Sequence, residues 1–274
     1  MTANVASAAP TALSGPGPAS SWRQVLLFTR QSLLDPHRGS AFGFAWLLLL
    51  PLVQILIYTL VFSRFMGARL GSVASPFAYS LYLVPGLLLW TAFANTVTGM
   101  AQVYATRAQI IRKIPVDLVR MPAYVPLVEL CLWGLAMLLF VLFCVGVGHQ
   151  PTLAWLLLPW LCATTLLLAY GIGLVLAALA QFAPDVRQLT GIVLQLGFWV
   201  TPVVYLVDIL PPWLAAVMKF HPVYWSIAPA QHIVLYGAPA SWTPMLWQLG
   251  AGLLALAAGS ALVRRLEKDI RDLL

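Results

Sequence analysis

The sequence predicts an all-α integral membrane protein with six transmembrane helices. Of its 274 residues, 61% are hydrophobic and only 8% are charged, whereas a soluble domain has roughly 25% charged residues. The apolar residues gather in six runs of about twenty residues or more, the length at which a helix crosses a hydrocarbon layer roughly 30 Å thick. We therefore expect one transmembrane domain at 39–263, with spans near 41–63, 79–100, 123–147, 153–180, 189–207 and 243–263.

The two ends of the chain differ from this apolar domain. Residues 1–20 are almost entirely Ala, Ser, Thr, Pro and Gly, a composition that predicts a disordered tail. Residues 21–38 are predicted to form a cytoplasmic interfacial helix, because the apolar side chains of this segment fall on one helical face. These side chains are Trp22, Val25, Leu26 and Leu33. A short helix packed on protein is the alternative. Residues 264–274 are expected to form a cytoplasmic C-terminal tail.

The Lys and Arg residues predict the orientation. With the N-terminus in the cytoplasm, three basic residues, Arg64, Arg69 and Lys219, fall outside and twelve fall inside. Cytoplasmic loops carry the excess of Lys and Arg, so both termini are expected in the cytoplasm. The net charge of +7 then reflects topology and not nucleic-acid binding. The inner twelve are Arg23, Arg30, Arg38, Arg107, Arg112, Lys113, Arg120, Arg187, Arg264, Arg265, Lys268 and Arg271.

The connector between the fifth and sixth spans is unusual. Residues 208–240 are largely apolar but are interrupted by five prolines, and neither half is long enough to span. Short apolar segments at a membrane boundary are typical of re-entrant or interfacial structure. We predict an external re-entrant hairpin here, with four aromatic side chains near the outer headgroups: Trp213, Tyr224, Trp225 and Trp242.

The sequence contains no recognisable catalytic or metal site. It has no GxxxxGK[ST] phosphate-binding loop, so another chain must bind any ATP that is used. Glu129 is the one carboxylate that lies clearly inside a predicted span. Two interpretations stay open for it, a structural role in the packing of the helices and a functional role in transport or catalysis. The histidines and cysteines have no metal-ligand or disulfide spacing; they are His37, His149, His221, His232, Cys131, Cys144 and Cys162.

Aromatic residues are abundant, with 11 Trp, 9 Tyr and 12 Phe. Most are expected to form interfacial belts or to pack between helices. The remainder could line a pathway, because flat apolar rings suit the C–H faces of sugars and let a chain slide. The candidates for such a channel are Tyr58, Trp90, Phe93, Trp199 and Tyr205.

Four motifs in order resemble the permease subunits of type 2 ABC exporters, which carry lipid-linked O-antigen, capsule or teichoic acid chains. The resemblance covers nearly the whole chain after the tail. In this family a basic, Pro-containing loop follows the second span, and an Asn-Pro pair is common where this chain has His221-Pro222. The motifs are Gly39–Trp46 running to Pro51 and Phe62, Ile111–Pro115, Asp185–Arg187 with Phe198–Tyr205, and Phe220–Tyr224.

The resemblance implies a homodimer joined to two copies of a cytoplasmic ATP-binding subunit, with a channel at the dimer interface. ATP and magnesium would be bound by the partner subunit and no cofactor by this chain. The resemblance also implies coupling to the ATPase through the interfacial helix and the loop 107–122, and the positive-inside rule is the alternative explanation for the same charges. The coupling candidates are Arg30, Arg107, Arg112, Lys113 and Asp117, and the candidates for an external gate are Pro211, Pro212, His221, Pro222 and Tyr224.

The expected function is export of a lipid-linked, O-antigen-like polysaccharide across a bacterial inner membrane, with ATP hydrolysis by a separate subunit. One alternative is a type 2 exporter of a smaller amphipath, such as a drug, a lipo-oligosaccharide or a teichoic acid. A second alternative, from another class, is an ion-coupled flippase or a membrane enzyme of glycan assembly. A requirement for Glu129 would favour this second class.

Overall fold

The described part of the chain is all-helical in a computed structural model. It comprises residues 18–34, 77–205, 207, 211–218 and 220–274, together with five residues between 49 and 57, and no strand occurs among these residues. All but five residues of the predicted first span at 41–63, and most of the predicted tail, therefore lie outside the described residues. The elements are α1 (Pro18–Leu34), α3 (Ala78–Thr106), α4 (Ala108–Lys113), η3 (Met121–Ala123), α5 (Tyr124–Gly146), η4 (Leu153–Leu157), α6 (Leu158–Phe182), α7 (Asp185–Val200), α8 (Pro212–Met218), α9 (Tyr224–Tyr236), α10 (Thr243–Arg265) and α11 (Glu267–Leu273).

Four helical segments are long and apolar enough to cross a membrane: Ala78–Thr106, Met121–Gly146, Leu153–Phe182 and Thr243–Arg265. They coincide with four of the six predicted spans. The fifth predicted span is helix α7, which has 16 residues and is about 24 Å long at 1.5 Å per residue. Six spans thus remain a prediction, of which the described chain supports four by length and composition.

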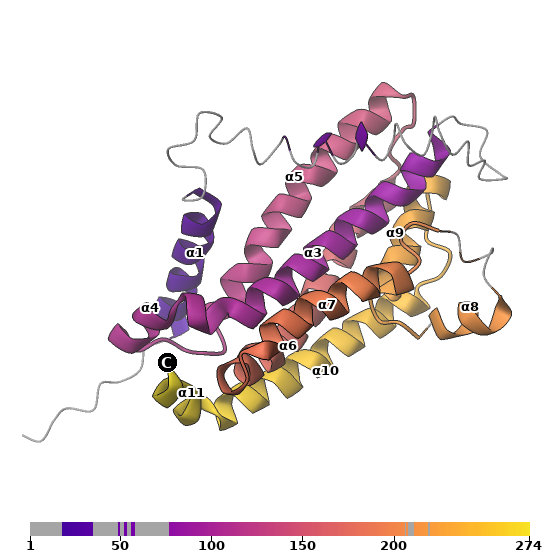
Figure 1. Ribbon diagram of the computed structural model, residues 1–274. Helices are drawn as coiled ribbons and strands as arrows, with labels where there is room; N and C mark the ends of the chain where they lie inside the picture. The colour runs from indigo at the N-terminus through magenta and orange to yellow at the C-terminus, as the bar shows by residue number, and fades with distance from the viewer. Residues whose placement is uncertain are drawn as a thin grey trace, which may run out of the picture.

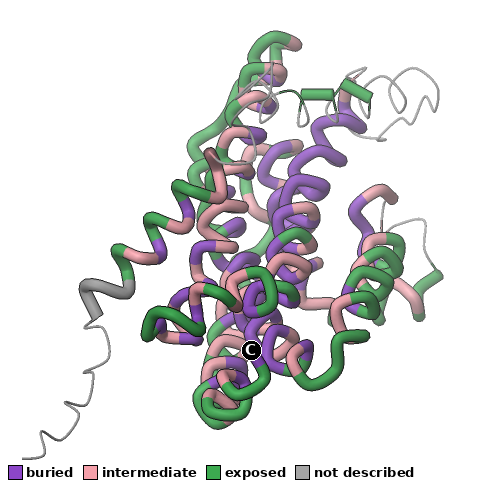
Figure 2. Tube along the Cα trace, turned by 60° about the vertical axis from the view of Figure 1, so that its left-hand side comes forward, coloured by how far each residue is buried: buried purple, intermediate pink, exposed green. Residues whose placement is uncertain are grey.

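Helix α3 is the central element of the bundle. Every residue from Ala78 to Trp90 is buried, and the helix packs against α5, α6, α7 and α9. This burial comes from the packing of its neighbours, because an apolar helix in a membrane could equally face lipid. Figure 2 shows this burial concentrated in the middle of the molecule, with exposed residues on the outer helices.

The bundle has two chemically different ends (Figure 1). At one end lie α1, α4, η3 and α11, with most of the described Lys and Arg residues; we call this the basic end. At the other lie α8, α9, η4 and the loop 147–152, with many exposed aromatic side chains; we call this the aromatic end. The exposed aromatics there include Trp213, Phe220, Tyr236, Trp242 and Trp247.

The predicted external hairpin folds into the two short helices α8 and α9. Helix α9, with 13 residues, is too short to span, but it is well packed: Ser226 accepts a hydrogen bond from Thr165 of α6 at 2.7 Å. The loop between α5 and α6 closes the other end of α9, since the ring of His149 binds the Val234 carbonyl at 2.8 Å and Thr152 donates to the Gly237 carbonyl. Re-entry of this segment into a membrane stays a prediction.

Helices α6 and α10 approach closely because two glycines lie at their crossing. A Cβ added at Gly171 would overlap the backbone of Ala255, and one at Gly259 would lie 2.5 Å from the Gly171 carbonyl oxygen. Small residues at a crossing let two helix backbones pack directly in a membrane. The α6–α10 contact therefore depends on the absence of side chains at these two positions.

We predict that Gly171→Ala destabilises the protein by about 1–3 kcal/mol, the usual cost of overpacking a tight contact. The measurement is thermal unfolding of the purified protein in detergent. Gly250→Ala on the same α10 helix is the matched control, because nothing lies within 4 Å of an added Cβ there. Its stability should stay within about 1 kcal/mol of wild type; equal effects of the two changes would contradict the packing argument.

Candidate functional site

The connector between α4 and η3, residues 114–120, is held by three helices at the basic end. Tyr104 of α3 donates to the Leu118 carbonyl at 2.7 Å, and Tyr170 of α6 donates to the Val119 carbonyl. From the C-terminal helix α11, Arg271 donates to the Val116 carbonyl at 2.7 Å. Three side chains from three helices therefore fix the backbone of one surface loop.

Asp117 shapes the same loop from within. Its carboxylate accepts hydrogen bonds from the N–H groups of Val119 at 2.8 Å and Arg120 at 3.1 Å. Aspartate side chains commonly stabilise turns by such local bonds. The ion pair with Arg120 at 3.4 Å is partly exposed and contributes little. In this structure Asp117 is thus a turn-forming residue.

Arg107 joins three helices where α3 passes into α4. Its guanidinium donates to Ser32 of α1 at 3.3 Å and to the Tyr124 hydroxyl at 3.4 Å. It also lies over the rings of Phe28 and Tyr124, at 5.1 and 5.2 Å from their centroids, within the range of a cation–π interaction. Arg107 therefore fixes the position of α1 against the bundle.

The other coupling candidates face outward. Arg112 and Lys113 are exposed at the end of α4, next to Ile114, which is 49% exposed, and Arg30 is exposed on α1. The basic tip of α4 is consequently presented to solvent or a partner on a loop whose base is rigid. An exposed apolar side chain that directly follows two cations suits a protein contact.

At the aromatic end, His221 lies where the α8–α9 connection meets α3 and α7. Its ring is 6.4 Å from the ring of Trp90, and its Nδ1 is 3.5 Å from the hydroxyl of Thr201. Burial lowers the pKa of the His221 imidazole below its ordinary value, because burial disfavours the charged form. His221 and Pro222 also border an apolar groove of about 500 Å³ that runs between α3, α6 and α7.

Glu129 lies on α5 and accepts a hydrogen bond from Asn95 of α3 at 3.2 Å. Both residues border a groove of about 360 Å³ that extends to Arg107 at the basic end. A paired carboxylate of this kind has a structural explanation. Among the residues that the structure describes, no three His, Cys, Asp or Glu side chains are grouped so that they could hold a metal.

Comparison with known proteins decides the family. The model of the ABC-2 type transporter family matches residues 23–235. The chain belongs to this family. It is therefore the multi-pass membrane subunit of a type 2 ABC transporter of the inner membrane and not itself an enzyme, and the family works with an ATP-binding subunit.

Three relatives of this ABC-2 subunit are named "O-antigen export system permease protein RfbA". Two come from Klebsiella pneumoniae, with 26% and 24% identity over 203 residues, which cover 72% of this chain and 74% of each relative. The third, from Myxococcus xanthus, is 26% identical over 181 residues, which cover 66% of this chain and 67% of that protein. The resemblance inferred from the four motifs is thereby confirmed.

The structure places the channel candidates of the ABC-2 subunit in different environments. Trp90 and Phe93 are buried in the core of a single chain, whereas Trp199 on α7 is 64% exposed. The Tyr205 hydroxyl donates to carbonyls at the end of α7, at 2.8 Å for Val200. Tyr58 lies outside the described residues. The channel role remains a prediction, and among the four described candidates Trp199 is the one that is exposed on the surface.

The gate candidates lie together at the aromatic end. Pro211 precedes the short helix α8, which begins at Pro212, and His221 and Pro222 lie in the turn before α9, which begins at Tyr224. The turn is closed by a hydrogen bond from the N–H of Tyr224 to the His221 carbonyl at 3.0 Å. The gating role of these residues stays a prediction.

Sequence reasoning missed the residues that hold the connector 114–120. Tyr104, Tyr170 and Arg271 lie in three different helices, and Arg271 is 155 residues from the carbonyl that it binds. The one sequence feature that could have indicated this role was the position of Tyr104 and Tyr170, each near the basic end of a predicted span. The predicted C-terminal tail contains helix α11, whose Ile270 is fully buried.

We predict that Arg271→Gln loosens the connector 114–120. The change removes a charge-assisted hydrogen bond, worth about 1.5–3 kcal/mol, so local amide hydrogen exchange at 114–120 should accelerate about ten-fold or more. Lys268→Gln, an exposed residue of the same helix, is the control and should leave exchange unchanged. Unchanged exchange in Arg271→Gln would show that Tyr104 and Tyr170 suffice.

We predict that acid destabilises the protein partly through His221. Its pKa is lower in the folded than in the unfolded state, so its contribution is complete above about pH 6.5 and is lost as the pH falls toward the folded pKa. Thermal unfolding measured between pH 7.5 and 5 should show a shallower decline for His221→Asn than for wild type. Identical pH profiles would contradict the assignment of this decline to His221.

Proposed function

We propose that this chain is the membrane subunit of an exporter that moves lipid-linked polysaccharide from the cytoplasm to the periplasm. The observation that carries the proposal is the similarity to three O-antigen export permeases over 66–72% of the chain. The aromatic end adds physical support, since exposed rings suit the C–H faces of sugars. The basic end would face the cytoplasm, as the twelve-to-three distribution of Lys and Arg favours.

The proposed assembly is a homodimer with two ATP-binding subunits, which would carry ATP and magnesium. The channel would lie between the two copies. In support, α7 exposes a row of large apolar side chains that a single chain leaves uncovered; they include Leu189, Val193, Leu196 and Trp199. A second copy or lipid must cover this face.

The tip of α4 is the proposed contact with the ATP-binding subunit. Arg112, Lys113 and Ile114 project there, and the connector behind them is bound to α3, α6 and α11 through Tyr104, Tyr170 and Arg271. Motion of the partner on ATP binding would therefore reach three helices at once. For such motion to drive transport, the contacts must differ between the two states of the pump.

The external hairpin is the proposed gate at the other end. Helices α8 and α9 are short, and the turn that contains His221 rests on Trp90 and Thr201. A shift of α7 would change the contact with Thr201, which follows α7 directly, and it would also reach Trp90 through Phe198 of α7, whose ring lies against that of Trp90. This arrangement supports coupling between α7 and the hairpin.

We predict that the double charge reversal Arg112→Glu with Lys113→Glu lowers polysaccharide export at least ten-fold while the chain still inserts. Reversed charges would repel the surface that the two cations contact. The matched control is Arg264→Glu with Arg265→Glu, the same charge change at exposed positions at the end of α10. The measurements are surface glycan and membrane abundance of the chain. Export at the level of the control would contradict the coupling role of the α4 tip.

The proposed function itself is tested by purifying the chain with the ATP-binding subunit encoded beside it and reconstituting both in lipid. A stable complex of two plus two subunits, whose ATPase rate responds to lipid-linked glycan, is expected. A chain that binds no ATP-binding subunit, yet moves or processes glycan alone, would overturn the proposal in favour of a flippase or an enzyme.

A further inference from the structure

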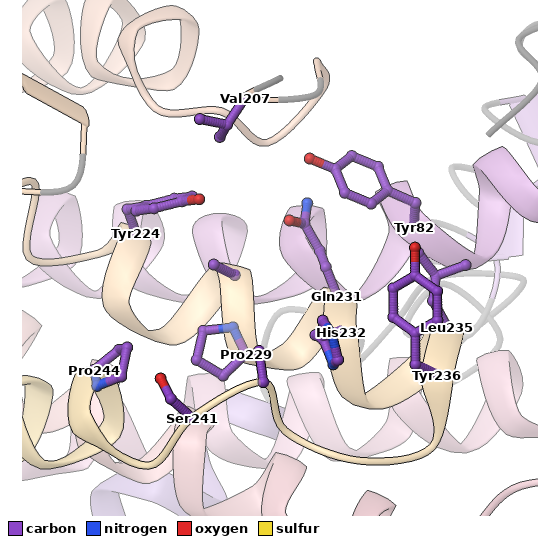
Figure 3. Close-up of a pocket in the computed structure, with 12 residues that line it drawn as sticks. Tyr82, Val207, Tyr224, Pro229, Gln231, His232, Leu235, Tyr236, Ser241 and Pro244 are labelled. Atoms are coloured by element: carbon purple, nitrogen blue, oxygen red, sulfur yellow. The ribbon is translucent and has the colours of Figure 1, made fainter. Parts of the chain in front are cut away.

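The aromatic end contains a pocket of about 420 Å³ between α9, the start of α10 and the start of α3 (Figure 3). This volume lies within the range of about 300–1,000 Å³ that is typical of small-molecule sites. We propose that the pocket binds one or two sugar units of a neutral glycan chain after the chain has crossed the membrane. This inference rests on the proposed function and adds a second binding site, away from the basic end.

The chemistry of the lining favours an uncharged sugar. Tyr82, Tyr224 and Tyr236 contribute phenol rings, and Gln231, His232 and Ser241 contribute hydrogen-bonding groups. No Asp, Glu, Lys or Arg occurs among the described residues that line the pocket. A phosphate or uronate would therefore find no cation among these described lining residues, and burying an unpaired charge is costly. A pyranose, with apolar C–H faces and a rim of hydroxyls, matches rings alternating with polar groups.

Hydrogen bonds fix which ring nitrogen of His232 carries the hydrogen and how the Gln231 amide is oriented. The Nδ1 of His232 lies 2.6 Å from the Ala238 carbonyl oxygen, and because a carbonyl can only accept, this nitrogen carries the hydrogen. In the neutral ring Nε2 is then an acceptor for a hydroxyl. The Gln231 amide donates through Nε2 to the Val203 carbonyl at 3.3 Å, which sets its orientation. Figure 3 shows this amide directed into the space between Tyr224 and Tyr82.

Most of the pocket is formed before any ligand binds. The Tyr82 hydroxyl donates to the Tyr205 carbonyl at 3.0 Å, and Gln231 packs against Gly86, where an added Cβ would lie 2.8 Å from its amide nitrogen. The ring of His232 lies 4.6 Å from that of Tyr236, which is 52% exposed. Tyr236 is thus a partly open wall on a rigid base, and preorganisation of this kind lowers the entropy cost of binding.

The affinity expected of such a pocket is low, which suits transport. A few hydrogen bonds and one or two ring contacts hold a sugar without preventing its release, and every repeat unit of a neutral chain can occupy the pocket in turn. Occupation at the outer end would hinder backward sliding while the ATP-binding subunits reset. The pocket would therefore favour outward movement without any chemistry of its own.

The test is site-specific photo-crosslinking in cells that make and export the glycan. A photoreactive benzoylphenylalanine replaces Tyr236 in the full chain, expressed with its ATP-binding subunit. Ultraviolet light should attach glycan covalently to the chain, and His232→Leu should reduce the adducts at least five-fold. The matched control places the same group at Trp247 of α10, which is 62% exposed and does not line this pocket.

The outcomes separate the pocket from the function on which it rests. Strong adducts at position 236 and weak ones at 247 support the pocket. Equal adducts at both positions, or none at 236 in cells that still export glycan through this chain, overturn it. If surface glycan does not depend on the chain at all, the proposed function fails and the pocket proposal fails with it.

A binding measurement on the purified complex in lipid nanodiscs tests the charge preference. Saturation-transfer NMR should detect neutral mannose and glucose oligosaccharides, and Tyr236→Ala should weaken their binding about ten-fold, whereas Trp247→Ala should not. An oligogalacturonate of the same length carries negative charges and should bind more weakly. Equal or tighter binding of the oligogalacturonate, or no effect of Tyr236→Ala, would overturn the proposal.

Discussion

The structure depends on one constraint, which is that backbone polar groups at membrane depth need partners within the protein. Long helices meet it internally, and α3, surrounded on all sides from Ala78 to Trp90, is the helix around which the others pack. Helix α9 is too short to span and has ends that must be covered. His149 and Thr152 from the neighbouring loop bind the carbonyls of Val234 and Gly237 at its C-terminal end.

A related requirement explains the rigidity of the basic end, where backbone groups that are buried away from water also need partners. The connector 114–120 is not helical, and Val116 and Leu118 are buried, so the carbonyls of this segment need donors from other elements. Tyr104, Tyr170 and Arg271 supply them at Leu118, Val119 and Val116. A loop bound in this way moves as one body with α3, α6 and α11. The rigidity that satisfies the backbone is also the property that a contact with a motor subunit needs.

The sequence was informative where a property depends on local composition. Hydropathy located the helices at 78–106, 121–146, 153–182 and 243–265 to within a few residues at most ends, because apolar length is a direct requirement of the bilayer. The fifth span predicted from hydropathy extends to residue 207, whereas helix α7 ends at Val200. The apolar character continues through Pro202 to Val204, but a proline disfavours the helical conformation of the residue before it, and Thr201 is extended.

The candidate site was less predictable, because its contacts join residues far apart in the chain. Arg112 and Lys113 are exposed at the basic end, and no sequence pattern distinguished them from Arg107, which packs on Phe28 and Tyr124. Likewise, Trp90 and Trp199 look alike in sequence, but the first is buried and the second exposed. Burial is a property of the tertiary arrangement, so it could not be read from single spans.

Helix α7 connects the two ends of the molecule in a way that bears on the transport mechanism. It begins at Asp185, beside Arg187, whose guanidinium donates to the Ala180 carbonyl near the end of α6 at 3.1 Å. At its other end Phe198 lies against Trp90 with ring centroids 6.0 Å apart, and Thr201 meets His221. Since Thr190 is its one buried residue, α7 is the least enclosed of the long helices. In the proposed mechanism, a displacement of α6 at the basic end would therefore move α7 with little loss of packing within one chain, and α7 would in turn move the hairpin.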